Sequence, residues 1–115
     1  MTSEELATLC AGAASEKQAE DIVVLDLRGI STFTDFFVIC SAGSEPQIKA
    51  IAGEIENDLR QGHNRRPVAI DGNSVSQWMI VDYGDVVVHI FHQAKRDLYS
   101  LEDLWSDAPK LELKA

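Results

Sequence analysis

The chain has 115 residues, and its 19 acidic side chains outnumber its 10 basic ones to give a formal net charge of -9. This length suits one domain, so we expect residues 1–115 to fold as a single domain without a structural metal or disulfide. The negative charge disfavours direct DNA binding and binding to anionic membranes, because both depend on Lys and Arg meeting phosphates.

The first half of the chain predicts a helix, two strands and a second helix. Thr2–Glu5 has the form of a capping box, and apolar residues at helical spacing continue to about Lys17. Residues 21–27 and 36–42 are short β-branched and aromatic runs, as expected for two neighbouring strands buried on both faces. A second capping box at Ser44–Gln47 predicts another helix, with its C-terminal cap near Gly62.

The second half predicts three strands and a final helix. The strands are expected at 66–72, 78–82 and 86–91, and a short Gly-containing turn joins the last two as a hairpin. The helix begins near Lys95 and would present four apolar side chains on one side: Leu98, Leu101, Leu104 and Trp105. This order predicts an α/β fold, a single-domain sandwich with a mixed five-stranded sheet flanked by helices.

Two cysteines, Cys10 and Cys40, lie apart in apolar surroundings and form no C-x-x-C pair. They are typical of reduced, inert, packed thiols. No segment approaches the ~20 apolar residues of a membrane span, and the N-terminus lacks the pattern of an export signal. We therefore expect a cytoplasmic protein.

The segment from Trp78 to Trp105 concentrates aromatic side chains and carboxylates, with Lys95 and Arg96 as its cations. Tryptophan and tyrosine are common anchors of protein interfaces, and carboxylates orient cationic partners. This composition favours binding of a basic protein over catalysis. Alternation along the strand at 78–82 sets Trp78 and Asp82 on one face and Tyr83 on the other, and either face can be the outward one.

Two candidate chemical sites are weaker. The turn at Gly43–Ser44 precedes a helix, where an anion can bind, but a turn with an N-cap explains it better because no P-loop or nearby cation accompanies it. Nucleotidyltransferases use such a turn with two carboxylates on a strand, whereas the acids that follow here, Glu54, Glu56 and Asp58, fall on the predicted helix.

His89 and His92 are the second candidate, as a metal pair. In a strand, residues three apart point to opposite faces, and a third protein ligand is lacking. We expect His89 to be a buried, hydrogen-bonded histidine and His92 to end the strand. The sequence thus predicts no metal and no cofactor.

Three motifs together resemble one family. DFFVICSAGSEPQIKAIAGEIE, WMIVDYGDVVVHIF and RDLYSLEDLW, in this order, are similar to the ribosomal silencing factor family, also called Iojap-like, and the match runs from about Leu6 to Asp107. The resemblance implies a bacterial cytoplasmic factor, not an enzyme, that docks on the fourteenth protein of the large ribosomal subunit. There it would block joining of the small subunit and lower translation when nutrients are short. The implied sheet is related to the nucleotidyltransferase core but lacks its catalytic acids.

Carried over from the matching motifs, the candidate partner contacts are Trp78, Met79, Asp82, Tyr83, His92, Arg96 and Tyr99. Trp78 and Tyr83 would bury apolar area, and Asp82 would pair with a cation of the partner. Two alternatives stay open. One is a nucleotidyltransferase-like, nucleotide-binding enzyme at Gly43–Ser44; the other is a homodimer that pairs through the same surface.

Overall fold

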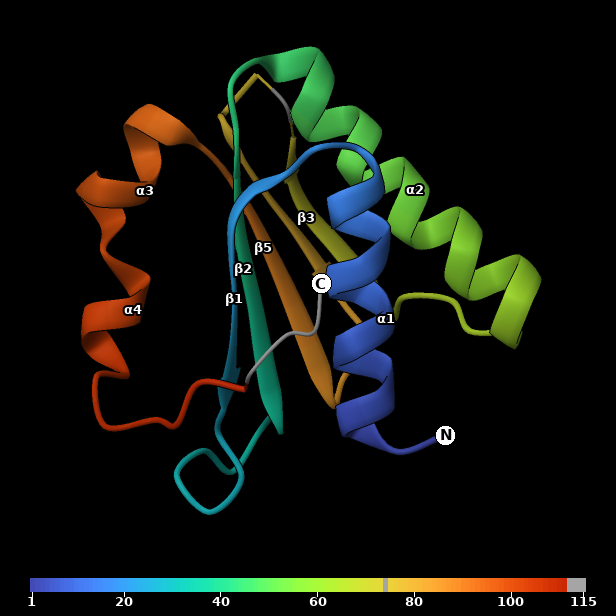
Figure 1. Cartoon of the computed structure of the whole chain (residues 1–115), viewed down its shortest axis with the longest axis vertical. Coiled ribbons are helices and arrows are strands. Elements are labelled where there is room, and N and C mark those ends of the chain that lie inside the picture. The colour runs from blue at the N-terminus through green and yellow to red at the C-terminus, as the bar shows by residue number, and fades with distance from the viewer. Residues whose placement is uncertain (74, 112–115) are drawn as a thin grey trace.

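A computed structural model describes residues 1–73 and 75–111. Its elements in chain order are α1 (Ser3–Glu16), β1 (Glu20–Asp26), β2 (Phe36–Ala42), α2 (Glu45–His63), β3 (Ala69–Asn73), β4 (Trp78–Asp82), β5 (Val86–His92), α3 (Gln93–Tyr99) and α4 (Leu101–Leu104). The strands form one sheet in the order β1-β2-β5-β4-β3. Helices α1 and α2 cover one face of the sheet, and α3 and α4 lie on the other (Figure 1).

The sheet is mixed, as predicted, because β2 and β5 pair in parallel at its centre while all other neighbours pair antiparallel. Every residue of β2 is buried, which confirms the expected burial on both faces for this strand. The same expectation is wrong for β1, which is an edge strand whose first two residues are exposed. The predicted bounds of β2 and β4 are confirmed. β3 begins at Ala69, later than expected, and the preceding Pro67 has no N–H to donate to a ladder.

The first core cluster lies between the sheet and the helix pair α1–α2. Thr2 and Glu5 form the predicted capping box of α1. The apolar stripe of α2 is buried as predicted; it comprises Ile48, Ile51, Ala52, Ile55 and Leu59.

The predicted cap of α2 at Gly62 is wrong. The helix continues to His63, and Asn64 caps it in the left-handed conformation with φ of 52°. Its N–H donates to the Arg60 carbonyl, and the N–H of Arg65 donates to the Leu59 carbonyl. Asparagine tolerates this conformation better than most residues, so it replaces the expected glycine.

The final helix differs from the prediction, because Ser100 breaks it into α3 and α4. Ser100 has φ of 44°, and its N–H donates a hydrogen bond to the carbonyl of Arg96. The break changes the direction of the chain, so Leu98 and Leu104 are 69% and 74% exposed. A second core cluster, on this side of the sheet, receives Leu101 and Trp105.

The outer edge of β1 is covered by the segment that follows α4. The N–H of Asp26 donates to the Pro109 carbonyl, and the N–H of Leu111 donates to the Val24 carbonyl, both at 2.8 Å. Within residues 1–73 and 75–111, no helix has the length and apolar character needed to cross a membrane.

Candidate partner-binding site

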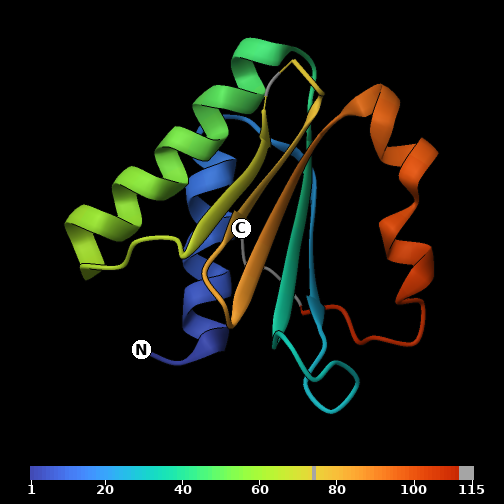
Figure 2. The ribbon, with the colours of Figure 1, turned by 180° about the vertical axis from the view of Figure 1, so that it is seen from behind.

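The packing of β4 shows which of its side chains face α1 and α2 and which face the opposite side of the sheet. Trp78 packs against the second core cluster, whereas Val81 and Tyr83 belong to the first, beneath α1 and α2. Alternation therefore turns Trp78, Ile80 and Asp82 toward the side of α3 and α4. Helix α3 packs on β5 and β2, toward the other end of the sheet from β3 (Figure 2).

A partly exposed surface results on β3, β4 and β5, which we call the open face; it comprises Asp71, Trp78, Ile80, Asp82 and Val87. The register places Asp71 opposite Ile80, and Asp82 opposite Val87. Asp71 is exposed, and the other four side chains are partly buried. An aromatic side chain with apolar neighbours is typical of the centre of an interface, and carboxylates around it suit the rim of an interface with a basic protein.

Trp78 is held firmly at one end of this face. Its indole stacks on Phe91, with ring centroids 4.9 Å apart, and its Nε1–H donates to Nδ1 of His89 at 3.3 Å. Because Nδ1 accepts, the neutral imidazole carries its proton on Nε2. A tryptophan whose orientation is fixed before binding loses little conformational freedom when a partner arrives.

His89 beneath it is only 6% exposed, and burial lowers its pKa to about 4. The imidazole is therefore neutral near pH 7. The predicted buried, hydrogen-bonded histidine is confirmed.

Within residues 1–73 and 75–111, no cation of the chain pairs with the carboxylates of the open face. Among the described residues, the ion pairs involve neither Asp71 nor Asp82. Asp82 Oδ1 accepts a hydrogen bond from the N–H of Gly84 at 2.7 Å, which fixes its direction at the hairpin. Both acids are thus placed to receive Lys or Arg of a partner.

Tyr83 was expected to anchor the partner, and the structure corrects this. It is only 3% exposed and belongs to the first core cluster, because its side chain faces α1 and α2. Burial raises its pKa, and within the described part of the chain its hydroxyl has no hydrogen-bond partner. Met79 packs partly buried against the same cluster. The structure therefore separates Met79 and Tyr83 from Trp78 and Asp82.

The remaining predicted contacts lie around α3. His92 is partly buried and caps this helix, because its Nδ1 accepts from the N–H of Ala94 at 3.1 Å. Arg96 is only 8% exposed, and all three of its side-chain nitrogens donate within the chain, so it is not presented to a partner. The backbone of Tyr99 ends α3, and its side chain lies outside the described part of the structure.

The Gly43–Ser44 turn makes hydrogen bonds to the Gln47 side chain and backbone. The N–H of Gly43 donates to Gln47 Oε1 at 2.8 Å, and Ser44 Oγ accepts from the N–H of Gln47. The Gln47 amide nitrogen in turn donates to the carbonyls of Lys17 and Gln18. The N–H groups of Gly43 and Gln47 at this turn are therefore engaged within the chain, which favours the N-cap interpretation over nucleotide binding.

One acidic cluster was missed by the sequence analysis. Oxygens of Glu16, Glu54 and Asp58 all lie within 4.8 Å of one another, where α1 meets α2. Residues 54 and 58 are one helical turn apart and share a side, a spacing that the sequence does contain. The cluster is about 15 Å along α2 from Ser44, so it does not complete a nucleotide site there. Glu54 also pairs with Lys17 at 3.9 Å.

Buried thiols offer no nucleophile. Burial raises the pKa of both Cys10 and Cys40 to about 12. At neutral pH both therefore remain thiols, as the apolar surroundings predict.

The chain is a small α/β domain, and its open face has the composition of a candidate partner-binding surface. The family model described as ribosomal silencing factor during starvation matches residues 1–115, and the chain belongs to this family. The resemblance found in the sequence is thereby confirmed.

Similar proteins agree in sequence and in structure. The ribosomal silencing factor of Halalkalibacterium halodurans is 42% identical over 114 residues, covering 99% of this chain and 97% of that protein. A solved structure from Chromobacterium violaceum has a TM-score of 0.87 at 29% identity, covering 100% of this chain and 94% of that one. A more distant mouse relative, named mitochondrial assembly of ribosomal large subunit protein 1, is 30% identical over 93 residues, which are 79% of this chain and 41% of that protein.

Proposed function

We propose that this protein is a cytoplasmic ribosomal silencing factor that binds the fourteenth protein of the large ribosomal subunit. Bound there, it blocks joining of the small subunit and represses translation under nutrient limitation. Family membership supports the regulatory, non-catalytic role, and the mouse relative's name points to the large subunit. The observation that carries the proposal is the open face, which joins Trp78 to two carboxylates that form no ion pair within the described part of the chain.

The mechanism is steric. Trp78 supplies the apolar anchor, while Asp71 and Asp82 pair with cations of the ribosomal protein. The net charge of -9 hastens encounter with a basic partner. The domain measures 34 × 33 × 28 Å, large enough to occupy the space that a second subunit needs. An interface of about 1,600 Å² suffices, because inhibition depends on occupancy and not on a chemical step.

The test is subunit joining in sucrose gradients with purified subunits. We expect the wild-type protein to lower the fraction of joined ribosomes. Trp78→Ala, which removes a central anchor worth about 2 kcal/mol, should require about 30-fold more protein for the same effect, and Asp82→Arg should act in the same direction.

Two control variants make equivalent changes elsewhere. Phe33→Ala removes an aromatic side chain that is 68% exposed on the β1–β2 loop, and Glu16→Arg reverses an exposed charge on α1. Both should inhibit joining like wild type. If a folded Trp78→Ala protein inhibits joining as well as wild type, the open face is not the binding surface. If the wild-type protein has no effect on joining, the proposed function is wrong.

We also propose that the free protein forms a homodimer through the open face, since a surface that accepts a partner can pair with itself. Light scattering should then show a mass that rises with concentration, and Trp78→Ala should lower it. A constant monomer mass for the wild type would contradict the dimer alone.

A further inference from the structure

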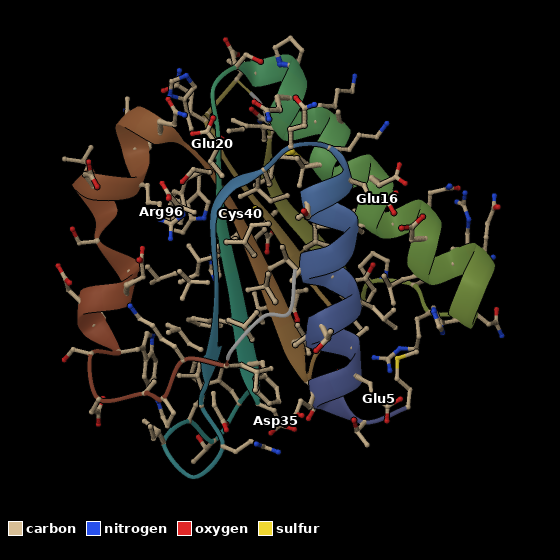
Figure 3. The ribbon with its side chains drawn as sticks, viewed as in Figure 1. Glu5, Glu16, Glu20, Asp35, Cys40 and Arg96 are labelled. Carbon is tan, nitrogen blue, oxygen red and sulfur yellow. The ribbon has the colours of Figure 1, made fainter. Side chains whose placement is uncertain are left out.

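Arg96 is a buried cation that links four elements of the fold. It lies between α3 and the sheet (Figure 3). Its Nη1 donates to Ser41 Oγ of β2 at 2.9 Å and to the carbonyl of Asp21 in β1. Its Nε and Nη2 donate to the two carboxylate oxygens of Glu102 in α4, at 3.0 and 3.2 Å. An arginine that makes such planar, two-pronged contacts fixes direction as well as distance.

The carbonyl of Asp21 belongs to a distorted part of β1. The pairing of β1 with β2 shifts between Glu20 and Val23, and Asp21 has φ of 50°. An irregular strand leaves backbone groups outside the ladder, and these need other partners when buried. Arg96 satisfies one of them. Gln93, one turn earlier in α3, donates to the Glu20 carboxylate at 2.6 Å, so α3 is fixed to this irregular stretch twice.

Helix α4 depends on contacts from outside itself. It has four residues, too few for a stable helix, and its first turn lacks a side-chain cap. The left-handed residue Ser100 separates it from α3. Within the described part of the chain, the hydrogen bonds of Glu102 to Arg96 are the side-chain hydrogen bonds that join α4 to the rest of the fold. The position of α4, and of Trp105 directly after it, therefore depends on the Arg96–Glu102 contact together with the packing of Leu101 and Trp105 on the second core cluster.

Trp105 is one end of an aromatic row that reaches the open face. Its ring meets Phe37 edge-on with centroids 6.0 Å apart, and Phe37 meets His89 at 4.6 Å. His89 then accepts the hydrogen bond from Trp78. Because a close-packed interior transmits strain between neighbouring side chains, a shift of α4 alters the packing around Trp78.

We propose that Arg96 is a positioning residue: through Glu102 and α4 it fixes the aromatic row and thereby the orientation of Trp78 on the open face. Its effect on ribosome binding rests on the function proposed above, whereas its effect on Trp78 does not.

The experiment compares Arg96→Lys with Arg28→Lys. Lysine keeps the charge but cannot make the two-pronged contact. Arg28 makes a similar contact with Asp26 on the surface, where its side chain is 50% exposed, so it is the matched control. The first measurement is the indole N–H resonance of Trp78 in the isolated protein, assigned with Trp78→Phe. The second is co-pelleting with purified large subunits.

We expect Arg96→Lys to move the Trp78 indole resonance and to weaken binding to the large subunit about tenfold, and Arg28→Lys to do neither. A folded Arg96→Lys protein with an unmoved resonance would overturn the proposal. If the resonance moves but the wild-type protein does not co-pellet, the positioning role stands and the proposed function fails.

A second variant keeps the test usable if Arg96→Lys does not fold. Glu102→Gln keeps the guanidinium and its bonds to Asp21 and Ser41 but weakens the link to α4. It should move the Trp78 resonance as well. A folded Glu102→Gln protein with the wild-type resonance would equally overturn the proposal.

Discussion

Acid should destabilise this protein through His89, well before most carboxylates titrate. The imidazole is buried beneath Trp78, and burial lowers its pKa to about 4, against 6.5 for the free side chain. Between these two values the unfolded chain binds a proton that the folded chain does not. The free energy of unfolding is therefore highest above pH 6.5 and falls as the pH drops toward 4.

The size of the effect follows from this difference in pKa. One pKa unit corresponds to about 1.4 kcal/mol, so the full loss below pH 4 is about 3 kcal/mol. At pH 5 the loss is about 2 kcal/mol, because the unfolded histidine is then almost fully protonated and the folded one is not. This is a large part of the about 5–15 kcal/mol that stabilises a typical domain.

Urea unfolding at pH 7.5, 6.5, 5.5 and 5.0 measures this loss of unfolding free energy, with His89→Asn as the reference. Asparagine does not titrate, and its side-chain oxygen can still accept from the Trp78 indole. The carboxylates titrate in both proteins, so the difference between the two stability curves isolates His89. A difference that stays constant from pH 7.5 to 5.0 would refute the assignment of a buried neutral histidine.

Two further predictions concern the core and a turn. Tyr83→Phe removes a buried hydroxyl without a described partner, so the unfolding free energy should stay level or rise by about 1–3 kcal/mol, and large-subunit binding should be unchanged; a clear drop in melting temperature would contradict this. Gly72→Ala should destabilise by more than about 2 kcal/mol in urea unfolding, because its new Cβ would lie 2.1 Å from the Trp78 carbonyl oxygen at a φ of 73°. Gly84→Ala, with φ of 91° and open space around it, should cost only the backbone strain of about 1–2 kcal/mol, and equal losses would refute the steric argument.

Much of the fold could be predicted because its signals are local. Ser44 and Pro46 mark the start of α2, and its apolar stripe follows at helical spacing. The prediction of one continuous helix over α3 and α4 failed because the local signal there was misleading. The spacing of the apolar residues matches one continuous helix, while Ser100, an ordinary residue in sequence terms, adopts the left-handed conformation that ends it.

The site could be predicted only in part. Alternation correctly joined Trp78 with Asp82 and separated them from Tyr83, but which side faces outward depends on where distant helices pack. The contacts of Arg96 could not be predicted from the sequence, because its partners Asp21 and Ser41 are 75 and 55 positions away. Proximity of this kind arises from tertiary packing, and the local periodicity of the sequence carries no information about it.

The parallel pairing of β2 with β5 has a consequence for how the chain matures. Phe36 pairs with Val86, so the most apolar strand emerges during synthesis some fifty positions ahead of its central neighbour. Long-range pairing of this kind slows folding, and until it forms, intermediates with exposed apolar surface are prone to aggregate. The first core cluster therefore stays incomplete until β5 is available to pair with β2, and until then the apolar β2 is open to association with other chains.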